Sequence, residues 1–198
     1  LFNSRVTPVV VELATGEVVA GQVDPATYDQ KKAMADPAMS TAAPQNPAQV
    51  TRIPKYAVMY EIFNDAGEVD LYVFPVEGKG LWSTLYGFLA LEHDLNTVRG
   101  ITFYQHGETP GLGGEVDNPS WKSKWPGRTL YADSGEPELE VIKGAAPPPE
   151  EAPYKVDGLS GATITSWGVT HLVHFWMGEN GFGEFVKKHR DAPEGSAA

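Results

Sequence analysis

Residues 57–76 read AVMYEIFNDAGEVDLYVFPV, and this stretch decides the fold. β-Branched and aromatic residues dominate residues 57–63 and 69–76, and the cluster Asn64-Asp65-Ala66-Gly67 separates the two runs. Two such runs around a cluster of turn-forming residues are typical of antiparallel strands joined by a short turn. We therefore predict a β-hairpin at the centre of the chain.

A second pair of strands is predicted directly after the first. Residues 85–92 and 98–104 flank the polar turn 93–96, so four antiparallel strands are expected in sequence order. Residues 139–142 are a further candidate strand that would extend this sheet. The aromatic residues of these strands are expected in the sheet core: Tyr60, Phe63, Tyr72, Phe74, Phe88 and Phe103.

The N-terminal part, residues 1–54, is expected to pack on or lead to a main domain at residues 55–198, so that the two form one structural unit. Residues 9–20 predict another hairpin, and residues 28–35 favour a short helix. Residues 36–54 collect prolines among small and polar residues, which predicts a mobile arm or connector.

Two helices are predicted near the C-terminal end. From Thr163 onward, apolar residues recur near helical spacing until Gly178: Ile164, Trp167, Leu172, Phe175 and Trp176. We expect this helix to pack on the sheet. A shorter helix is predicted over residues 184–189. The fold class that follows is α+β, with a twisted, mainly antiparallel sheet and packed helices.

Composition excludes several classes of function. The 198 residues include 15 Lys and Arg against 26 Asp and Glu, a net charge of −11, and no cysteine. The deficit of basic residues argues against nucleic acid as a partner. The absence of cysteine excludes disulfides, thiolate zinc sites, iron–sulfur ligation and a cysteine nucleophile. His171 and His174 have no third ligand at a motif spacing, so no metal site is expected.

Two glycine-rich segments indicate a ligand. Residues 106–115 read HGETPGLGGE, directly after a predicted strand, and four glycines would let the backbone pass close to a flat ligand. An ordinary glycine-rich turn is the alternative interpretation. Residues 157–166 read DGLSGATITS and lead into the predicted helix, where free N–H groups and the helix dipole favour a phosphate. Helix capping by Ser or Thr is the alternative for one or two of these hydroxyls.

Residues 157–163, DGLSGAT, resemble the flavinylation motif Asp-x-x-Ser/Thr-Gly-Ala-Thr of FMN-binding domains. In those domains flavin mononucleotide is esterified through its phosphate to the last threonine. Three further segments resemble the C subunit of the sodium-translocating NADH:ubiquinone reductase: residues 80–83 (GLWS), 107–114 (GETPGLGG) and 175–183 (FWMGENGFG). The resemblance covers about residues 6–191.

A sister family, the G subunit of the ion-translocating ferredoxin:NAD reductase, resembles the same chain in its flavinylation motif and its Glu-Thr-Pro-Gly-Leu-Gly loop. The additional Gly114, the long N-terminal region and the closing segment 175–183 favour the C subunit of the sodium-translocating enzyme. From a different class, a secreted ligand-binding module without a redox role would also explain the Trp and Tyr content.

On the phosphate side, the resemblance implies that Thr163 holds FMN through a phosphoester. Ser160, Gly161 and Ala162 would form the turn around this group. Asp157 would serve recognition by a flavin transferase, an enzyme that uses FAD and releases AMP.

On the ring side, the resemblance implies an apolar wall and a set of polar contacts. Trp82 and Leu112 would line the isoalloxazine ring, and the loop at Gly111 would let the backbone approach its edge. The expected polar contacts are Ser83, Glu108, Thr109 and Lys143.

The function implied by the resemblance is electron transfer within a membrane complex that couples NADH oxidation and quinone reduction to sodium export. The other subunits of that complex would be the partners, and this chain alone would turn over no substrate. Subunits of this kind lie at the cell inner membrane as an extracytoplasmic (periplasmic) domain, anchored by an N-terminal helix that this sequence does not include.

Overall fold

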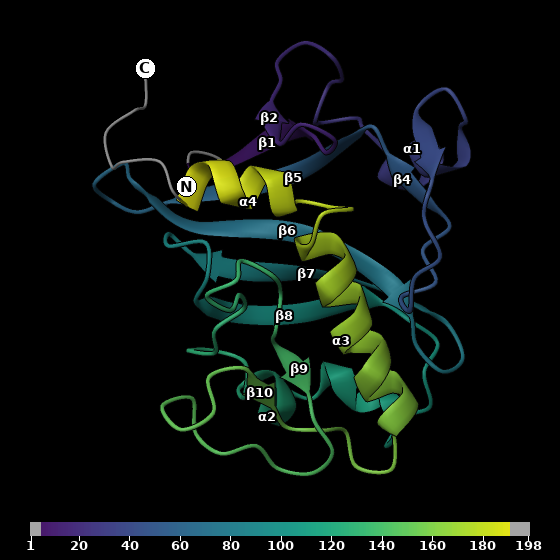
Figure 1. Cartoon of the computed structure of the whole chain (residues 1–198), viewed down its shortest axis with the longest axis vertical. Coiled ribbons are helices and arrows are strands. Elements are labelled where there is room, and N and C mark those ends of the chain that lie inside the picture. Colours follow the sequence, from purple (N-terminus) through teal and green to yellow (C-terminus); the bar gives the residue numbers. More distant parts are fainter. Residues whose placement is uncertain (1–4, 191–198) are drawn as a thin grey trace.

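The structure, a computed structural model, describes residues 5–190 and contains a six-stranded antiparallel sheet in the order β2-β1-β5-β6-β7-β8 (Figure 1). The strands are β1 (Val6–Glu12), β2 (Glu17–Val18), β5 (Tyr56–Phe63), β6 (Val69–Lys79), β7 (Thr84–Glu92) and β8 (Val98–Gln105). Helices α3 (Thr163–Met177) and α4 (Gly183–Arg190) lie over one face of this sheet (Figure 1). The α+β prediction is confirmed.

The four central strands β5–β8 have the predicted order and pair as consecutive antiparallel neighbours. Along β7 every second residue is buried, because successive side chains of a strand point to opposite faces. Leu85, Leu89 and Leu91 thereby face the core under the helices. Of the aromatic residues expected in the core, Phe74 and Phe103 are buried, and the others are partly buried: Tyr60, Phe63, Tyr72 and Phe88.

The N-terminal hairpin prediction is confirmed, although β2 is only two residues long. Strand β1 also pairs with β5, so it is part of the central sheet. The short helix is α1 (Gln30–Ala35), and the Asp29 side chain caps it by accepting a hydrogen bond from the Lys32 N–H at 3.1 Å. The expected ranges 1–54 and 55–198 include residues 1–4 and 191–198, which lie outside the described residues.

The prediction of a mobile arm or connector over residues 36–54 is wrong. Strand β3 (Ser40–Ala42) pairs with β4 (Arg52–Pro54), and the Arg52 guanidinium donates two hydrogen bonds of 2.8 Å to Ser40. Pro44 and Pro47 lie in the loop between these strands, where a missing N–H costs no ladder hydrogen bond. Strands of three residues are too short to show a recognisable sequence pattern.

The expectation that residues 139–142 extend the central sheet is also wrong. Strand β9 (Glu140–Val141) pairs in parallel with β10 (Lys155–Val156) in a separate two-stranded sheet. Between β8 and β9 lie a short 3-10 helix, η1 (Gly113–Asp117), and α2 (Pro119–Lys122). Because β10 runs directly into residue 157, the β9–β10 pair places residues 142–145 beside the segment that leads into α3.

Helix α3 packs closely on the end of β6. A Cβ at Gly168 would lie 2.4 Å from the Lys79 carbonyl oxygen, and a Cβ at Gly78 would lie 2.6 Å from the Leu172 Cβ. Glycine at both positions therefore lets the helix approach the strand backbone, and the first turns of α3 come to lie against the β6–β7 turn at residues 80–83. No helix in residues 5–190 is long and apolar enough to cross a membrane.

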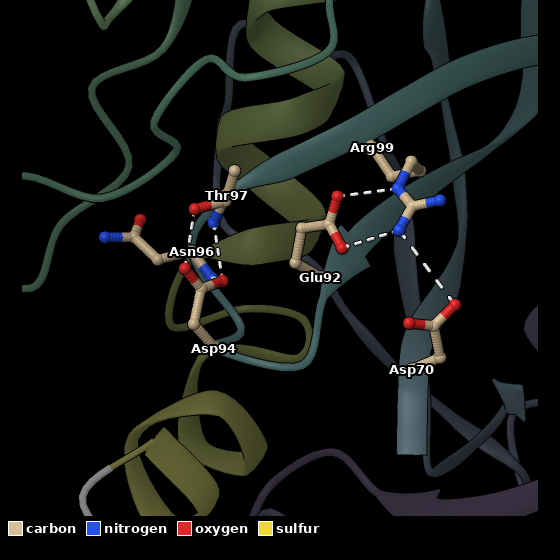
Figure 2. Close-up of polar contacts among 6 residues, drawn as sticks. All are labelled: Asp70, Glu92, Asp94, Asn96, Thr97 and Arg99. Carbon is tan, nitrogen blue, oxygen red and sulfur yellow. Dashed lines mark hydrogen bonds and ion pairs between the residues drawn. The ribbon is translucent and has the colours of Figure 1, made fainter. Parts of the chain in front are cut away.

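At the other end of β7, the turn to β8 is closed by its own side chains (Figure 2). The Asp94 carboxylate accepts hydrogen bonds from the backbone N–H groups of Asn96 at 2.9 Å and Thr97 at 2.7 Å. The Arg99 guanidinium donates two hydrogen bonds to the Glu92 carboxylate on the neighbouring strand, at 2.6 Å to Oε1 and 2.8 Å to Oε2. These local contacts fix the register of β7 and β8.

Candidate functional site

The first turn of α3 is open toward solvent. Gly161 has a φ of +69°, in the left-handed region that glycine adopts without a steric penalty. Ala162 follows at the N-cap position, and its side chain makes no capping hydrogen bond. Capping by Ser or Thr, one of the two interpretations left open by the sequence, is therefore not observed at this position. The N–H groups at the start of α3 are available to an anion.

The hydroxyls of this segment divide into two pairs. Ser166 hydrogen-bonds backbone atoms just before the helix at 3.0 and 3.1 Å, and Thr165 donates a hydrogen bond of 2.7 Å to Glu108. Both side chains are buried and hold the turn in place. Ser160, Thr163 and Ser166 line a cavity, but the Ser166 hydroxyl is already used in its two backbone hydrogen bonds. Thr163 is thus the threonine of the segment that a ligand can reach.

The cavity in front of α3 has a volume of about 520 Å³. One wall is residues 141–145, and the other is residues 157–161 with Thr163, Ser166 and Trp167. Gly158 fits only as glycine, because a Cβ there would lie 2.2 Å from the Ile142 carbonyl oxygen. The Asp157 carboxylate accepts a hydrogen bond from the Ala146 N–H at 3.1 Å, which ties the two walls together.

Glu108 occupies the space between the β6–β7 turn and α3. Its carboxylate is buried and accepts hydrogen bonds from the N–H groups of Leu81 at 3.1 Å, Trp82 at 3.0 Å and Ser83 at 3.0 Å. The hydroxyls of Ser83, at 3.1 Å, and Thr165, at 2.7 Å, donate two more. Burial acts to raise the pKa of Glu108, but these hydrogen bonds outweigh it and hold the pKa below its ordinary value. The carboxylate is therefore ionised at neutral pH.

Large apolar side chains are exposed around the start of α3. We call this set the α3 apolar patch: Leu81 (39% exposed), Trp82 (67%), Leu112 (44%), Ile164 (51%) and Trp167 (56%). Leu112 reaches within 3.0 Å of the Cβ position at Gly161, so the loop 106–115 meets the segment before α3. Exposed aromatic and aliphatic side chains gathered in one region mark a ligand or partner site.

The predicted packing of α3 on the sheet is confirmed, but Ile164 and Trp167 are not part of the packed face, since both are about half exposed. The buried face of α3 consists of other positions, including Thr165, Val169 and Leu172. Trp167 follows Thr163 by four residues and therefore shares its helix face. That spacing was the available signal for Trp167 as a site residue.

The structure places the predicted site residues in two adjoining groups. Around the cavity lie Asp157, Ser160, Gly161, Thr163 and Lys143, with Ala162 buried behind them. The second group comprises Trp82, Ser83, Glu108, Thr109, Gly111 and Leu112. Hydrogen bonds join Glu108 to Trp82, Ser83 and the first turn of α3, and join Thr109 to Leu112.

Trp82 and Leu112 are not among the residues that line the cavity, whereas Trp167 is. The contact of Trp82 and Leu112 with a flavin ring stays a prediction. Thr109 acts through its backbone carbonyl, which accepts hydrogen bonds from the N–H groups of Leu112 at 3.1 Å and Gly114 at 2.9 Å. In residues 5–190 no group of three or more His, Cys, Asp or Glu side chains is arranged to hold a metal ion.

Comparison with known proteins yields matches over this site and over the whole fold. The family model of the FMN-binding domain matches residues 80–178, which include both groups of site residues. The C subunit of the Na(+)-translocating NADH-quinone reductase of Pseudomonas aeruginosa is 52% identical over 193 residues, covering 96% of this chain and 73% of that protein. The corresponding C subunit from Vibrio vulnificus is 48% identical over 193 residues, covering 96% and 74%.

Two solved structures resemble the fold. Shewanella oneidensis NqrC superposes with a TM-score of 0.90 at 35% identity, covering 96% of this chain and 87% of that chain. The C subunit of the Na(+)-translocating NADH-quinone reductase of Parabacteroides distasonis has a TM-score of 0.70 at 28% identity, covering 97% and 82%. Each match therefore extends over nearly the whole of this chain.

Proposed function

The chain belongs to the family of Na(+)-translocating NADH-quinone reductase C subunits, and from this premise we propose that it carries FMN on Thr163 and transfers electrons within that complex. The flavin is bound covalently through a phosphoester to the Thr163 hydroxyl. The complex couples NADH oxidation and quinone reduction to sodium export. This chain contributes one redox carrier to the complex and turns over no substrate by itself.

The observation that carries the proposal is the open helix start beside a cavity. The first turn of α3 has no side-chain cap, and Thr163 lines the cavity of about 520 Å³. Backbone N–H groups and the helix dipole stabilise negative charge there. Lys143 lines the same cavity and adds a positive charge. These residues fit a phosphate group.

The α3 apolar patch supplies surfaces for a flat ring system. Trp82 and Leu112 flank the first turn of α3 on one side, and Trp167 lies on the cavity side. Aromatic and aliphatic side chains of this kind bury an isoalloxazine ring and exclude water from one of its faces. The flavin supplies the redox chemistry, and the protein supplies attachment, orientation and polarity.

Maturation and location follow from the same premise. A flavin transferase attaches the FMN moiety from FAD, and Asp157 contributes to recognition of the acceptor segment. The domain works on the extracytoplasmic (periplasmic) side of the inner membrane, and its partners are the other subunits of the complex. A covalent cofactor is retained through repeated exchange of electrons with those partners, because it does not depend on equilibrium binding.

The test is co-expression of the chain with a flavin transferase, followed by intact mass and visible absorption spectra. The parent chain should gain one FMN moiety, and Thr163→Ala should gain none. Thr163→Ser, which keeps a hydroxyl, should retain at least part of the attachment. Thr7→Ala changes an exposed threonine on β1 and is the matched control.

Two outcomes would contradict the proposal. Attachment of FMN to Thr163→Ala at the level of the parent would exclude Thr163 as the attachment site. A parent chain that takes up no flavin would favour a ligand-binding module without a redox role.

A further inference from the structure

The surroundings of the Glu108 carboxylate are unusual for a buried charge. Glu108 is 5% exposed, and no Lys, Arg or His of residues 5–190 forms a salt bridge with it. Its charge is balanced by three backbone N–H groups and two hydroxyls. Buried carboxylates are costly unless hydrogen bonds satisfy them, so a carboxylate held in this way fixes the groups that donate to it.

The donors come from segments far apart in the sequence. Oε1 accepts from Trp82 and Ser83, whereas Oε2 accepts from Leu81 and Thr165. The carboxylate thus joins the turn that carries Trp82 to the helix turn that carries Thr163. Each oxygen is used, and each has a different set of donors.

Glycines enclose the carboxylate on two sides. A Cβ at Gly80 would lie 2.7 Å from Oε1, and a Cβ at Gly113 would lie 2.8 Å from Oε2 and 2.5 Å from the Thr165 Oγ1. The backbone of both the β6–β7 turn and η1 therefore closes around Glu108. Because its oxygens are already occupied and enclosed, Glu108 is placed to hold other residues and not to contact a ligand.

We propose that Glu108 is a positioning residue, which locks the Trp82 turn (residues 80–83) to the first turn of α3 so that the ring-side and phosphate-side walls of the flavin site form one rigid unit. This inference rests on the proposed function and replaces the direct flavin contact expected for Glu108 from the family resemblance. An electron carrier benefits from such rigidity, because polar groups that are already oriented need not reorganise when the charge of the cofactor changes.

Glu108→Gln tests this proposal directly, because all five groups that hydrogen-bond to the carboxylate are hydrogen-bond donors. A glutamine amide presents one oxygen and one NH₂, so one set of donors faces another donor whichever way the amide is turned. The less costly orientation places the NH₂ at the Oε2 position, where the Thr165 hydroxyl can rotate to accept. The Leu81 N–H then loses its partner.

The first readout needs no flavin and is amide hydrogen exchange of the full chain, followed by NMR. In Glu108→Gln we expect exchange of the Leu81 N–H to be at least about tenfold faster than in the parent, the effect of losing one hydrogen bond to a charged group. Unchanged exchange at residues 81–83 in a folded Glu108→Gln chain would overturn the proposal.

Glu115→Gln is the matched control for this exchange experiment. Glu115 lies in η1, in the same segment as Glu108, and its carboxylate accepts a hydrogen bond of 2.7 Å from the Asn118 side chain. The N–H groups of the Trp82 turn donate to Glu108 and not to Glu115. Glu115→Gln should therefore leave the exchange of residues 81–83 unchanged. Equal acceleration in the two variants would overturn the specific role of Glu108.

A second pair of variants keeps the test decisive if Glu108→Gln does not fold. Thr165→Val removes one donor to Glu108 without changing the carboxylate, and Thr165→Ser restores a hydroxyl. We expect faster exchange at residues 81–83 in Thr165→Val and parent-like exchange in Thr165→Ser. Equal exchange in the two variants would overturn the lock between the helix and the turn.

The second readout uses the flavin-loaded chain. Glu108→Gln and Thr165→Val should keep FMN on Thr163 but change its fluorescence yield and midpoint potential, whereas Glu115→Gln and Thr165→Ser should match the parent. Parent-like flavin properties in all four variants would overturn the positioning role. If the parent itself takes up no flavin, the proposed function fails, and the exchange experiment still decides whether Glu108 locks the two turns.

Discussion

The two turns at opposite ends of β7 are built in different ways. The β7–β8 turn is closed from within, since Asp94 accepts hydrogen bonds from residues two and three positions later (Figure 2). The β6–β7 turn at residues 80–83 has one backbone hydrogen bond of its own, from the Gly80 N–H to the Ser83 carbonyl at 2.8 Å, and its other three N–H groups donate to Glu108, which lies beyond the end of β8. The β7–β8 turn therefore only connects two strands. The β6–β7 turn is held by a residue of another segment, and its Leu81 and Trp82 side chains are exposed, as a ligand or partner site requires.

The two carboxylates have similar electrostatics in different surroundings. For Asp94, as for Glu108, burial acts to raise the pKa, and hydrogen bonds outweigh it so that the pKa is lowered. Near Asp94 the surface carries the ion pairs of Arg99 with Glu92 and Asp70 (Figure 2). The comparison predicts that disturbing Asp94 affects stability alone, whereas disturbing Glu108 affects both stability and the flavin site.

The largest effect is expected for Glu108→Ala. Removing the carboxylate leaves buried N–H groups of the β6–β7 turn without an acceptor, and each such group costs about 1–3 kcal/mol. We expect the free energy of unfolding to fall by about 3 kcal/mol, measured by urea denaturation of the apo chain. Glu115→Ala, in the same segment, should change it by less than about 0.5 kcal/mol. An equal loss of the free energy of unfolding in the two variants would show that the hydrogen bonds of Glu108 do not stabilise the fold more than those of Glu115.

A smaller effect is expected for Asp94→Ala at the other end of β7. The Asn96 and Thr97 N–H groups lie in an exposed turn, where water replaces part of the lost hydrogen bonding. The free energy of unfolding should fall by about 1 kcal/mol. Flavin content, fluorescence and midpoint potential should all match the parent. A change in midpoint potential would contradict the division of roles between the two turns.

The sequence predicts the parts of the molecule that depend on local patterns. Alternating burial along β7 and the periodic start of α3 at Thr163 are recognisable because each is set by neighbouring residues. The motif at residues 157–163 likewise locates the cavity wall. The parallel pairing of β9 with β10 was not predictable, since two-residue strands carry no pattern and their partners are fixed by tertiary packing.

The hydrogen bond between Glu108 and Thr165 in the candidate site could not be predicted from the sequence for the same reason. The two residues are 57 positions apart, and no sequence spacing links a loop glutamate to a helix threonine at that separation. The sequence identifies both segments as unusual, and the family resemblance places Glu108 among the expected flavin contacts, but neither links Glu108 to Thr165. Only the packing of α3 on β6, through Gly78 and Gly168, brings the two side chains together.

Protonation of Glu108 and Asp94 at acid pH should lower the free energy of unfolding. The loss should be smaller than in Glu108→Ala and Asp94→Ala, because a protonated carboxyl keeps part of its hydrogen bonding. Each carboxylate has a lower pKa in the folded chain than in the unfolded chain, so the unfolded chain binds more protons. Their contribution to stability is present above the unfolded pKa, about 4 for these groups, and is lost as the pH falls through the folded pKa.

The measurement is the free energy of unfolding between about pH 7 and pH 3. In Glu108→Gln and in Asp94→Asn, the free energy of unfolding should fall less between neutral and acid pH than it does in the parent. The strand between the two sites has a length of about 30 Å at roughly 3.3 Å per residue, so the double variant should show the sum of the two changes. A parent-like acid limb in Glu108→Gln would mean that this carboxylate does not stabilise the fold through its charge.

The smallest effect is expected for Arg99→Met, which removes the ion pairs with Glu92 and Asp70 and keeps an apolar stem on β8. The guanidinium is exposed, and its pKa is raised chiefly by the hydrogen bonds to Glu92. Exposed pairs of this kind contribute about 0.5 kcal/mol, and the contribution falls with added salt. We therefore expect a loss of about 0.5 kcal/mol in low salt that fades in high salt, with unchanged flavin properties. A loss as large as that of Asp94→Ala, independent of salt, would show that the surface ion pairs and not the Asp94 turn hold this end of the sheet together.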